Sequence, residues 1–205
     1  MEDLLDLYAE AYDPGCPVIC FDEKPQQLIG ETRVPLPAKS GHPQRYDFEY
    51  KRNGTCNLFI FFEPHTGQRH VKVTKRRTKL DFVLCMRDAV DQLYPEAERF
   101  RLVLDNLNTH TPGSLYEAFV PAEARRIMRR LEFHYTPKHA SWLNMVEIEL
   151  STLSRQCLNR RIADKETLQA EIQVWQTERN RSKATVHWRF TNSIARQRFR
   201  SRYLS

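Results

Sequence analysis

The sequence lacks any long apolar run, any basic leader and any internal repeat. No hydrophobic stretch approaches the roughly 20 residues that a membrane-spanning helix needs. The first six residues, Met-Glu-Asp-Leu-Leu-Asp, are acidic where a secretory signal would be basic. These absences argue against membrane, secreted and repeat proteins. We therefore expect a cytoplasmic protein with no membrane partner.

A cysteine pattern that would indicate disulfides or zinc is also missing. The chain has five cysteines, an odd number, and Cys20 and Cys85 lie inside apolar runs, which predicts reduced, buried thiols. Cys16 and Cys20 are four residues apart, but no second Cys/His pair follows at zinc-finger spacing. Neither a disulfide framework nor structural zinc is expected.

The 205 residues suit one domain, and 40% hydrophobic with 28% charged residues predicts a folded protein with a core. Lys and Arg number 32 against 26 Asp and Glu, a formal net charge of +6. An excess of this size permits a polyanionic partner such as nucleic acid but does not establish one.

The first half of the chain reads as a short helical lead-in, residues 1–17, followed by strands. An apolar run at 18–22 predicts a buried strand. Alternation at 46–50 and an apolar stretch at 55–63 predict two strands joined by a hairpin turn at Asn53-Gly54. A further alternating strand is expected at 70–74. This half should form an antiparallel arrangement built on one buried strand.

The second half alternates helices and strands. Helices are predicted at 79–94, at 115–131 as one or two segments, at 142–160, and after an N-cap at Asp164, with strands at 100–105 and 131–135. Such strand–helix–strand units imply parallel pairing with right-handed crossovers. We expect an α/β mixed sheet, with its first three strands antiparallel and the remainder parallel, flanked by helices. That order is typical of an RNase H-like sheet, although other mixed α/β folds share it.

Two predicted strands each end on an aspartate, Asp22 and Asp105. Reactive groups of open α/β sheets gather at the carboxyl ends of the strands. On neighbouring parallel strands the two carboxylates would lie side by side and would need a cation between them, for which Mg²⁺, a hard ion with oxygen ligands, is suited. The alternative is that each aspartate only begins a turn.

A third carboxylate is expected from the helix at 142–160. Its apolar stripe includes Val146, Leu150 and Leu153, and Glu147 and Glu149 fall on opposite flanks of that stripe. Helix geometry does not choose between the two glutamates, and both could be ordinary boundary residues. With three carboxylates a site can hold two metal ions, one activating the attacking oxygen and the other stabilising the departing oxygen of a phosphodiester.

Three phrases of the sequence resemble the DDE transposases of the mariner superfamily, particularly its bacterial insertion-sequence branch. They are Phe-Asp-Glu-Lys at 21–24, Leu-Asp-Asn-Leu-Asn-Thr-His at 104–110, and Tyr-Thr-Pro-Lys-His-Ala-Ser-Trp-Leu-Asn-Met-Val-Glu at 135–147. In that family an Asp ends the first strand, Asp-Asn ends the fourth, and the third acid follows a Ser-x-x-Leu-Asn-x-x-Glu phrase. The resemblance implies that Asp22, Asp105 and Glu147 are the catalytic metal ligands.

The resemblance implies an RNase H-like catalytic domain over 18–205 and a Mg²⁺-dependent polynucleotidyl transferase using two ions, with Mn²⁺ as a substitute. DNA would be cleaved at an element end, and the freed 3′-hydroxyl would attack target DNA at a TA dinucleotide, within a homodimer. The family places a helix-turn-helix region ahead of this domain, and we expect it to be absent here. A nuclease that never joins DNA, or a non-catalytic DNA-binding remnant, are the alternatives.

Further candidates are weaker. A basic run offers phosphate contacts for DNA, or is only a solvated loop. Four residues near the motifs are possible supporting residues, of which His110 and His139 could touch a phosphate or be structural, and Asn144 could orient a ligand or cap a helix. The basic tail carries arginines at every second position from 196 to 202. The basic run comprises Lys72, Lys75, Arg76, Arg77 and Lys79; the supporting residues are Asn106, His110, His139 and Asn144.

Overall fold

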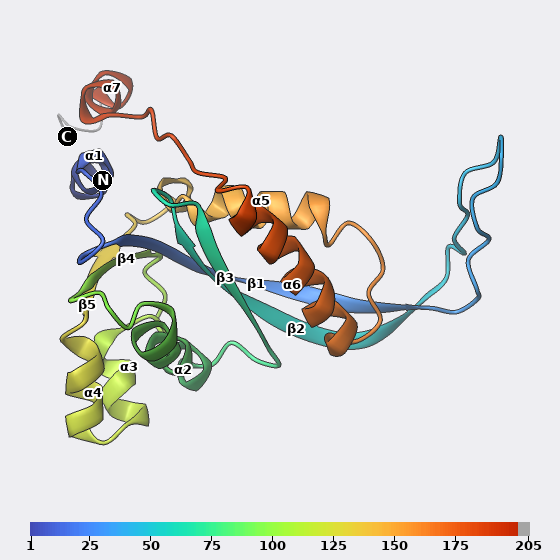
Figure 1. Ribbon diagram of the computed structural model, residues 1–205, viewed down its shortest axis with the longest axis horizontal. Helices are drawn as coiled ribbons and strands as arrows, with labels where there is room; N and C mark the ends of the chain where they lie inside the picture. The colour runs from blue at the N-terminus through green and yellow to red at the C-terminus, as the bar shows by residue number, and fades with distance from the viewer. Residues whose placement is uncertain (201–205) are drawn as a thin grey trace.

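The computed structural model describes residues 1–200, and its centre is a five-stranded mixed sheet in the order β3-β2-β1-β4-β5 (Figure 1). β2 pairs antiparallel with both β1 and β3, whereas β4 pairs parallel with both β1 and β5. The expected division into an antiparallel half and a parallel half is confirmed. The strands are β1 (Val18–Glu31), β2 (Tyr50–Glu63), β3 (Gln68–Thr74), β4 (Phe100–Leu104) and β5 (Leu131–Tyr135).

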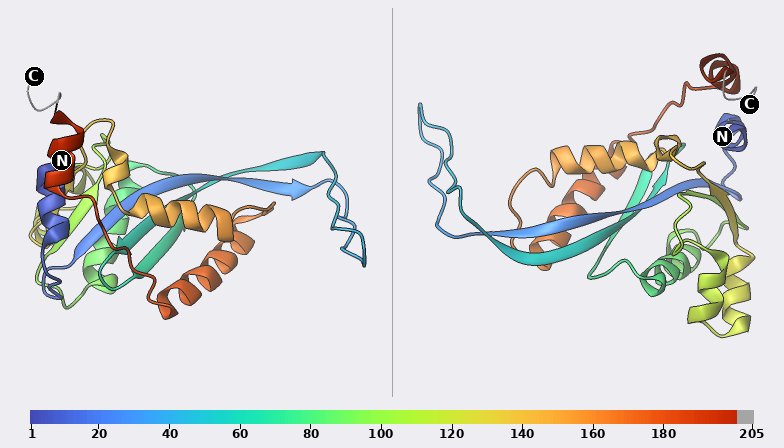
Figure 2. Two further views of the ribbon diagram at one scale, coloured as in Figure 1. Left: turned by 90° about the horizontal axis from the view of Figure 1, so that it is seen from above. Right: turned by 180° about the vertical axis from the view of Figure 1, so that it is seen from behind.

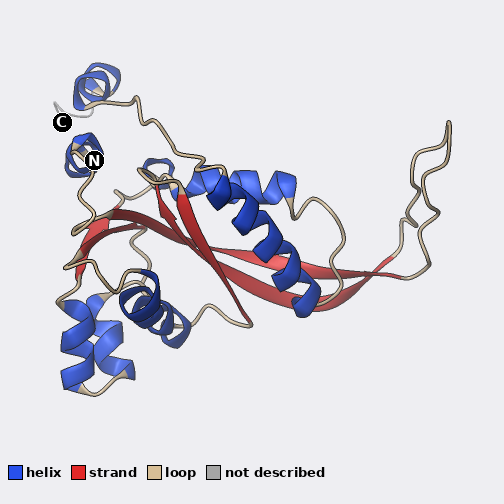
Figure 3. Ribbon diagram, in the orientation of Figure 1, coloured by secondary structure: helices blue, strands red, loops and turns tan. Residues whose placement is uncertain are grey.

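Helices cover both faces of the sheet (Figures 2 and 3). One face packs against α5 and α6, and the other against α2, α3 and α4. The helices are α1 (Glu2–Ala9), α2 (Lys79–Asp88), α3 (Pro112–Ala118), α4 (Pro121–Met128), α5 (Val146–Gln156), α6 (Lys165–Arg181) and α7 (Asn192–Arg198). A π-helical turn (Ala89–Leu93) extends α2, and a 3-10 turn (Ser141–Leu143) precedes α5.

Alternation along β1 sends successive side chains to opposite faces. Val18 and Cys20 belong to the core on the α5 side, whereas Ile19 and Phe21 belong to the core on the α2 side. All four side chains are buried. Burial on both faces explains why this strand reads as a continuous apolar run.

The predicted hairpin turn at Asn53-Gly54 is wrong, because both residues lie inside β2. The register passes from Gln27↔Thr55 to Ile29↔Arg52, so one residue of β1 faces two residues of β2. This is a β-bulge, and Gly54 adopts the positive φ of 103° that it requires. The strand expected at 46–50 is also wrong: β2 begins only at Tyr50, and residues 32–49 form an extended arm between β1 and β2 (Figure 1).

Most helix predictions are confirmed with shifted ends. The stretch at 115–131 is two helices, separated before Pro121, and the helix expected from 142 begins instead at Val146. Asp164 caps α6 as expected, its Oδ1 accepting the Thr167 N–H at 2.7 Å. The basic tail contributes α7, where Arg196 pairs with Glu2 of the lead-in helix α1. The expected tail residue Arg202 lies outside the described residues.

The cysteines have the states expected from the sequence. All five are free, and Cys20 and Cys85 are buried. Within residues 1–200, no helix is long and apolar enough to cross a bilayer.

Candidate active site

Asp22 lies within β1, and Asp105 directly follows β4, the parallel neighbour of β1. The last register pair of the two strands is Cys20↔Val103, two residues before each aspartate. Cys20 and Val103 both face the α5 side of the sheet. Because residues two apart in a strand share a face, Asp22 points toward the α5 side. Asp105 lies beyond the end of β4, and its Oδ1 meets His110, whose ring packs against Phe82 of the core on the α2 side. Asp105 follows the end of its strand as predicted, whereas the prediction that Asp22 ends its strand is wrong, because β1 continues to Glu31 in its pairing with β2. The two carboxylates are still close enough for the charge of Asp105 to raise the pKa of Asp22.

Glu147 and Glu149 have opposite surroundings in α5. Glu147 lines an open cleft of about 490 Å³ together with Asp22. Glu149 is 1% exposed and forms ion pairs with Arg69 at 2.9 Å and Arg179 at 2.7 Å. Two residues turn a helix by about 200°, so only one of them can face the cleft. Helix geometry alone did not decide between Glu147 and Glu149; in the structure Glu147 is the acid that faces the cleft.

The pKa of the Asp22 carboxyl is raised in the folded protein. Burial raises the pKa of Asp22 to about 7, the Glu23 N–H counteracts this by donating a hydrogen bond, and the charges of Asp105, Glu23 and Glu147 raise it further. Desolvation and like charge both disfavour an ionised carboxylate. A cation close to these acids would reverse both effects.

The donor chemistry of this cleft suits a hard divalent cation, because the acids Asp22, Glu23 and Glu147 line it, and the charge of Asp105 acts on Asp22. No three His, Cys, Asp or Glu side chains among residues 1–200 converge closely enough to hold one ion. Three like charges repel one another unless a cation lies between them. The assignment of Asp22, Asp105 and Glu147 as metal ligands stays a prediction.

His110 joins the aspartate site to a second acid that the sequence did not single out. Its Nδ1 lies 2.7 Å from Asp105 Oδ1, and its Nε2 lies 3.0 Å from Glu23 Oε2. The His110 side chain is 1% exposed and the Glu23 side chain 4%. Burial would lower the pKa of His110, but its contacts with Asp105 and Glu23 outweigh burial and raise the pKa to about 9.

The other supporting residues have different positions. Asn144 is buried, and its Nδ2 donates to the Phe21 carbonyl at 2.8 Å, which ties the segment before α5 to β1 next to Asp22. Met145, not Asn144, is the N-cap of α5. Asn106 is exposed directly after Asp105. His139 is exposed with a positive φ of 63° and lines a separate cavity with Trp142.

The predicted basic run divides into paired and unpaired residues. Lys72 forms an ion pair with Asp88, and Lys79 forms one with Glu117 at 2.9 Å. The other three, Lys75, Arg76 and Arg77, are exposed in the loop between β3 and α2, and none has an ion pair within residues 1–200.

Two cations of the carboxylate cleft were missed by sequence reasoning, Lys24 and Arg155. Lys24 Nζ donates to Ser154 Oγ at 2.6 Å, and Arg155 is exposed. In the described part of the chain neither forms an ion pair with a carboxylate. The available signals were the position of Lys24 within the Phe-Asp-Glu-Lys phrase and the position of Arg155 two helical turns beyond Glu147.

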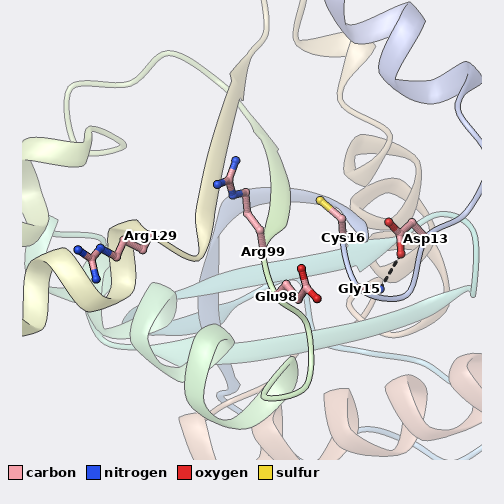
Figure 4. A pocket seen from close by; sticks show the side chains of 6 residues that line it. All are labelled: Asp13, Gly15, Cys16, Glu98, Arg99 and Arg129. Atoms are coloured by element: carbon pink, nitrogen blue, oxygen red, sulfur yellow. Dashed lines mark hydrogen bonds between the residues drawn. The ribbon is translucent and has the colours of Figure 1, made fainter.

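A further cavity lies at the opposite end of the sheet, before β1 and β4 begin (Figure 4). Its lining mixes acids and arginines, and the Arg99 and Arg129 side chains point in different directions. The Asp13 side chain there accepts the Gly15 N–H at 2.8 Å, as an ordinary turn residue does. These groups do not converge on one point, and the cavity has no assigned role.

Comparisons with known proteins agree with this geometry. The sequence profile of a family described as DDE superfamily endonuclease matches residues 17–169. No curated protein sequence matches the chain.

Among solved structures, the Mos1 mariner paired end complex with Mn matches with a TM-score of 0.57 and 15% identity over 89% of this chain and 55% of that chain. A pre-cleavage Mos1 transpososome matches with a TM-score of 0.56 and 13% identity, over 92% of this chain and 61% of that chain. The Mos1 transposase paired-end complex with left transposon end matches with a TM-score of 0.57 and 15% identity. The match covers 89% of this chain and 55% of that chain.

The chain thus spans between one half and two thirds of the length of these Mos1 chains. At such low identity the likeness shows the fold, the RNase H-like mixed sheet expected from the sequence. The family match covers about three quarters of the chain, from before β1 into α6. The chain belongs to the DDE superfamily of endonucleases.

Proposed function

We propose that this chain is the catalytic domain of a transposase, which cleaves DNA at the end of a mobile element and joins the freed 3′-hydroxyl to target DNA. The observation that carries the proposal is that Asp22 on β1 lies beside Asp105, which directly follows the parallel neighbour β4, with Glu147 lining the same cleft as Asp22. Membership of the DDE superfamily supports the cleavage chemistry, and the fold shared with Mos1 transposase complexes supports transposition.

In this proposal Asp22, Asp105 and Glu147 hold divalent cations, Mg²⁺ with Mn²⁺ as a substitute, and two ions per site. Ions bound there would activate the attacking water or hydroxyl and stabilise the departing oxygen. The carboxylates themselves orient the ions and keep negative charge where the cations bind. The Mos1 complex described as containing Mn supports a divalent ion of this kind.

Lys24 and Arg155 are proposed contacts for the DNA backbone next to the scissile phosphate. Glu147, Ser151 and Arg155 follow one another at four-residue spacing on one face of α5, so the cleft wall extends about 12 Å from the acid. Successive phosphates of one strand advance about 3.4 Å along the duplex axis, so this wall is long enough for about three of them. The free cations Lys75, Arg76 and Arg77 would contact more distant phosphates.

The finer features implied by the resemblance belong to the same proposal: insertion at TA dinucleotides, a homodimer as the active assembly, and action on bacterial DNA in the cytoplasm. The Mos1 structures are described as paired end complexes, which supports an assembly that holds DNA ends.

The test is cleavage and joining by the purified chain with Mn²⁺ or Mg²⁺, using a duplex with a 3′-hydroxyl end and a supercoiled plasmid target. We expect Asp22→Asn, Asp105→Asn and Glu147→Gln to be folded and inactive, because each removes a ligand charge. Glu178→Gln is the matched control, since within residues 1–200 the one ion pair of Glu178 is with Arg181 on the surface of α6.

The products separate the alternatives. Joined DNA supports transposition, and cleavage without joining would indicate a nuclease. Full activity of Glu147→Gln would refute the assignment of the third acid, and no metal-dependent activity of the wild-type chain would indicate a DNA-binding remnant.

A further inference from the structure

We propose that Glu23 and His110 are a positioning pair that fixes the orientation of both catalytic aspartates, each through its Oδ1 atom. This inference rests on the proposed function, because it assigns a role to residues around the proposed metal ligands. Glu23 lines the cleft, but its side chain is 4% exposed, and the His110 side chain is 1% exposed. Their effect is exerted through Asp22 and Asp105.

The first step is the contact between His110 and Asp105. His110 Nδ1 lies 2.7 Å from Asp105 Oδ1, close enough for a strong charge-assisted hydrogen bond. The ring cannot easily turn, because it packs against Phe82 at 4.8 Å and against Phe21 edge-on at 5.6 Å between ring centroids. The backbone is held as well, since Tyr135 Oη donates to the His110 carbonyl at 2.8 Å. Asp105 thus meets a donor with a fixed position.

The second step is the double role of Glu23. Its backbone N–H donates to Asp22 Oδ1 at 2.8 Å, and its side chain reaches the opposite face of the sheet, where Oε2 lies 3.0 Å from His110 Nε2. One residue therefore connects to both aspartates, directly to Asp22 and through His110 to Asp105. Glu23 on β1 thereby fixes the orientation of the two carboxylates relative to each other.

The third step is what this arrangement leaves for the metal. The two hydrogen bonds engage Oδ1 of each aspartate and make no use of Oδ2 of either. Partners that hydrogen-bond to ligating side chains fix their orientation, and removing them typically weakens metal affinity or activity by about 10- to 100-fold. The burial of His110, at 1% exposure, keeps it from contacting DNA itself.

Two substitutions of His110 separate positioning from simple charge neutralisation. Asn places its amide nitrogen near the position of Nδ1, so His110→Asn keeps a donor for Asp105 and loses the contact with Glu23. Gln places its amide nitrogen near Nε2, so His110→Gln keeps the contact with Glu23 and loses the donor for Asp105. If His110 served only to satisfy the buried Glu23, Gln would be the better replacement.

The readout is Mn²⁺ affinity, measured by calorimetry on the full chain, with DNA cleavage measured in parallel. We expect His110→Gln to weaken Mn²⁺ binding by about tenfold or more, and His110→Asn to remain nearer to wild type. His134→Gln is the matched control, because His134 is also held between two acids, Asp3 and Glu132, both at 3.0 Å, on a strand that carries no proposed ligand. It should leave the affinity unchanged.

The opposite order, with His110→Asn the weaker binder, would overturn the positioning role. If the His110 variants unfold, Glu23→Ala tests the same idea, since it removes the support of the ring and leaves the backbone donor to Asp22 in place. Unchanged Mn²⁺ affinity in Glu23→Ala would then refute it. Asp105→Asn shows which proposal has failed. If it leaves Mn²⁺ affinity unchanged, the proposed metal site itself is wrong. If it weakens Mn²⁺ binding while the His110 and Glu23 variants do not, only the positioning pair is refuted.

Discussion

Replacing Asp22 with Asn should stabilise the protein at pH 8 when no divalent cation is added. The pKa of Asp22 rises from 3.8 to about 7 in the folded protein, first because of burial. The folded state therefore takes up a proton between these two pH values more readily than the unfolded chain does. Consequently the free energy of unfolding falls as pH rises through this window, and the full penalty is present above pH 7.

The size of the effect follows from the shift. Three pKa units correspond to about 4 kcal/mol. Because Asp22 is only half-buried at the edge of an open cleft, solvent screening reduces this to roughly 2 kcal/mol. Asn has nearly the same shape and no charge, so Asp22→Asn should remove the penalty at pH 8. It should change little at pH 4, because this pH lies close to the unfolded pKa of 3.8 and only a small part of the penalty has developed there.

Urea unfolding at pH 4, 6 and 8 in EDTA measures this directly. Asp164→Asn is the control with the opposite sign: hydrogen bonds from Thr167 lower the pKa of Asp164, so its ionised form stabilises the fold above its ordinary pKa. Added Mn²⁺ should stabilise the wild type and not Asp22→Asn. Equal stability of the two proteins at pH 8, or a gain that is the same at every pH, would refute the reasoning.

Two further changes test other parts of the structure. Glu149→Gln should lower the free energy of unfolding by about 3–5 kcal/mol, because it leaves the fully buried Arg69 without its carboxylate partner. Glu147→Gln should change the free energy of unfolding little, and equal urea midpoints for the two variants would contradict this. Replacing Arg76 and Arg77 together with Ala should flatten the slope of log DNA affinity against log salt by up to about two units, and an unchanged slope would move the contact surface to Lys24 and Arg155.

The division of the sheet into an antiparallel and a parallel half, and the two aspartates, could be predicted from the sequence because they follow from local patterns. The apolar runs before Asp22 and Asp105 indicate buried strands, and the helices between successive strands of the second half imply parallel pairing there. Parallel neighbours bring their carboxyl ends to the same edge. The motif resemblance selected Glu147, which is the glutamate that lines the cleft in the structure.

The features that sequence reasoning missed depend on residues far apart in the chain. Glu149 is buried because Arg69 and Arg179 meet it from β3 and α6, and no helical pattern contains that information. The contact between Glu23 and His110 likewise joins β1 to the loop between β4 and α3.

The hairpin prediction failed for a different reason. Asn53-Gly54 has the composition of a turn, but pairing of β2 with β1 from Tyr50 to Phe62 converts it into a bulge. Tertiary pairing, which the local pattern cannot contain, decides between these two uses of the same dipeptide.

Anomalous diffraction from crystals soaked in Mn²⁺ tests the central claim most directly, because it locates the ion without relying on activity. The account predicts a peak held by Asp22 and Asp105, with Glu147 on the same side, and loss of that peak in Asp105→Asn. A peak in the cavity of Asp13 and Glu98 at the opposite end of the sheet, or no peak near Asp22 and Asp105, would contradict the assignment of these carboxylates as the catalytic metal site.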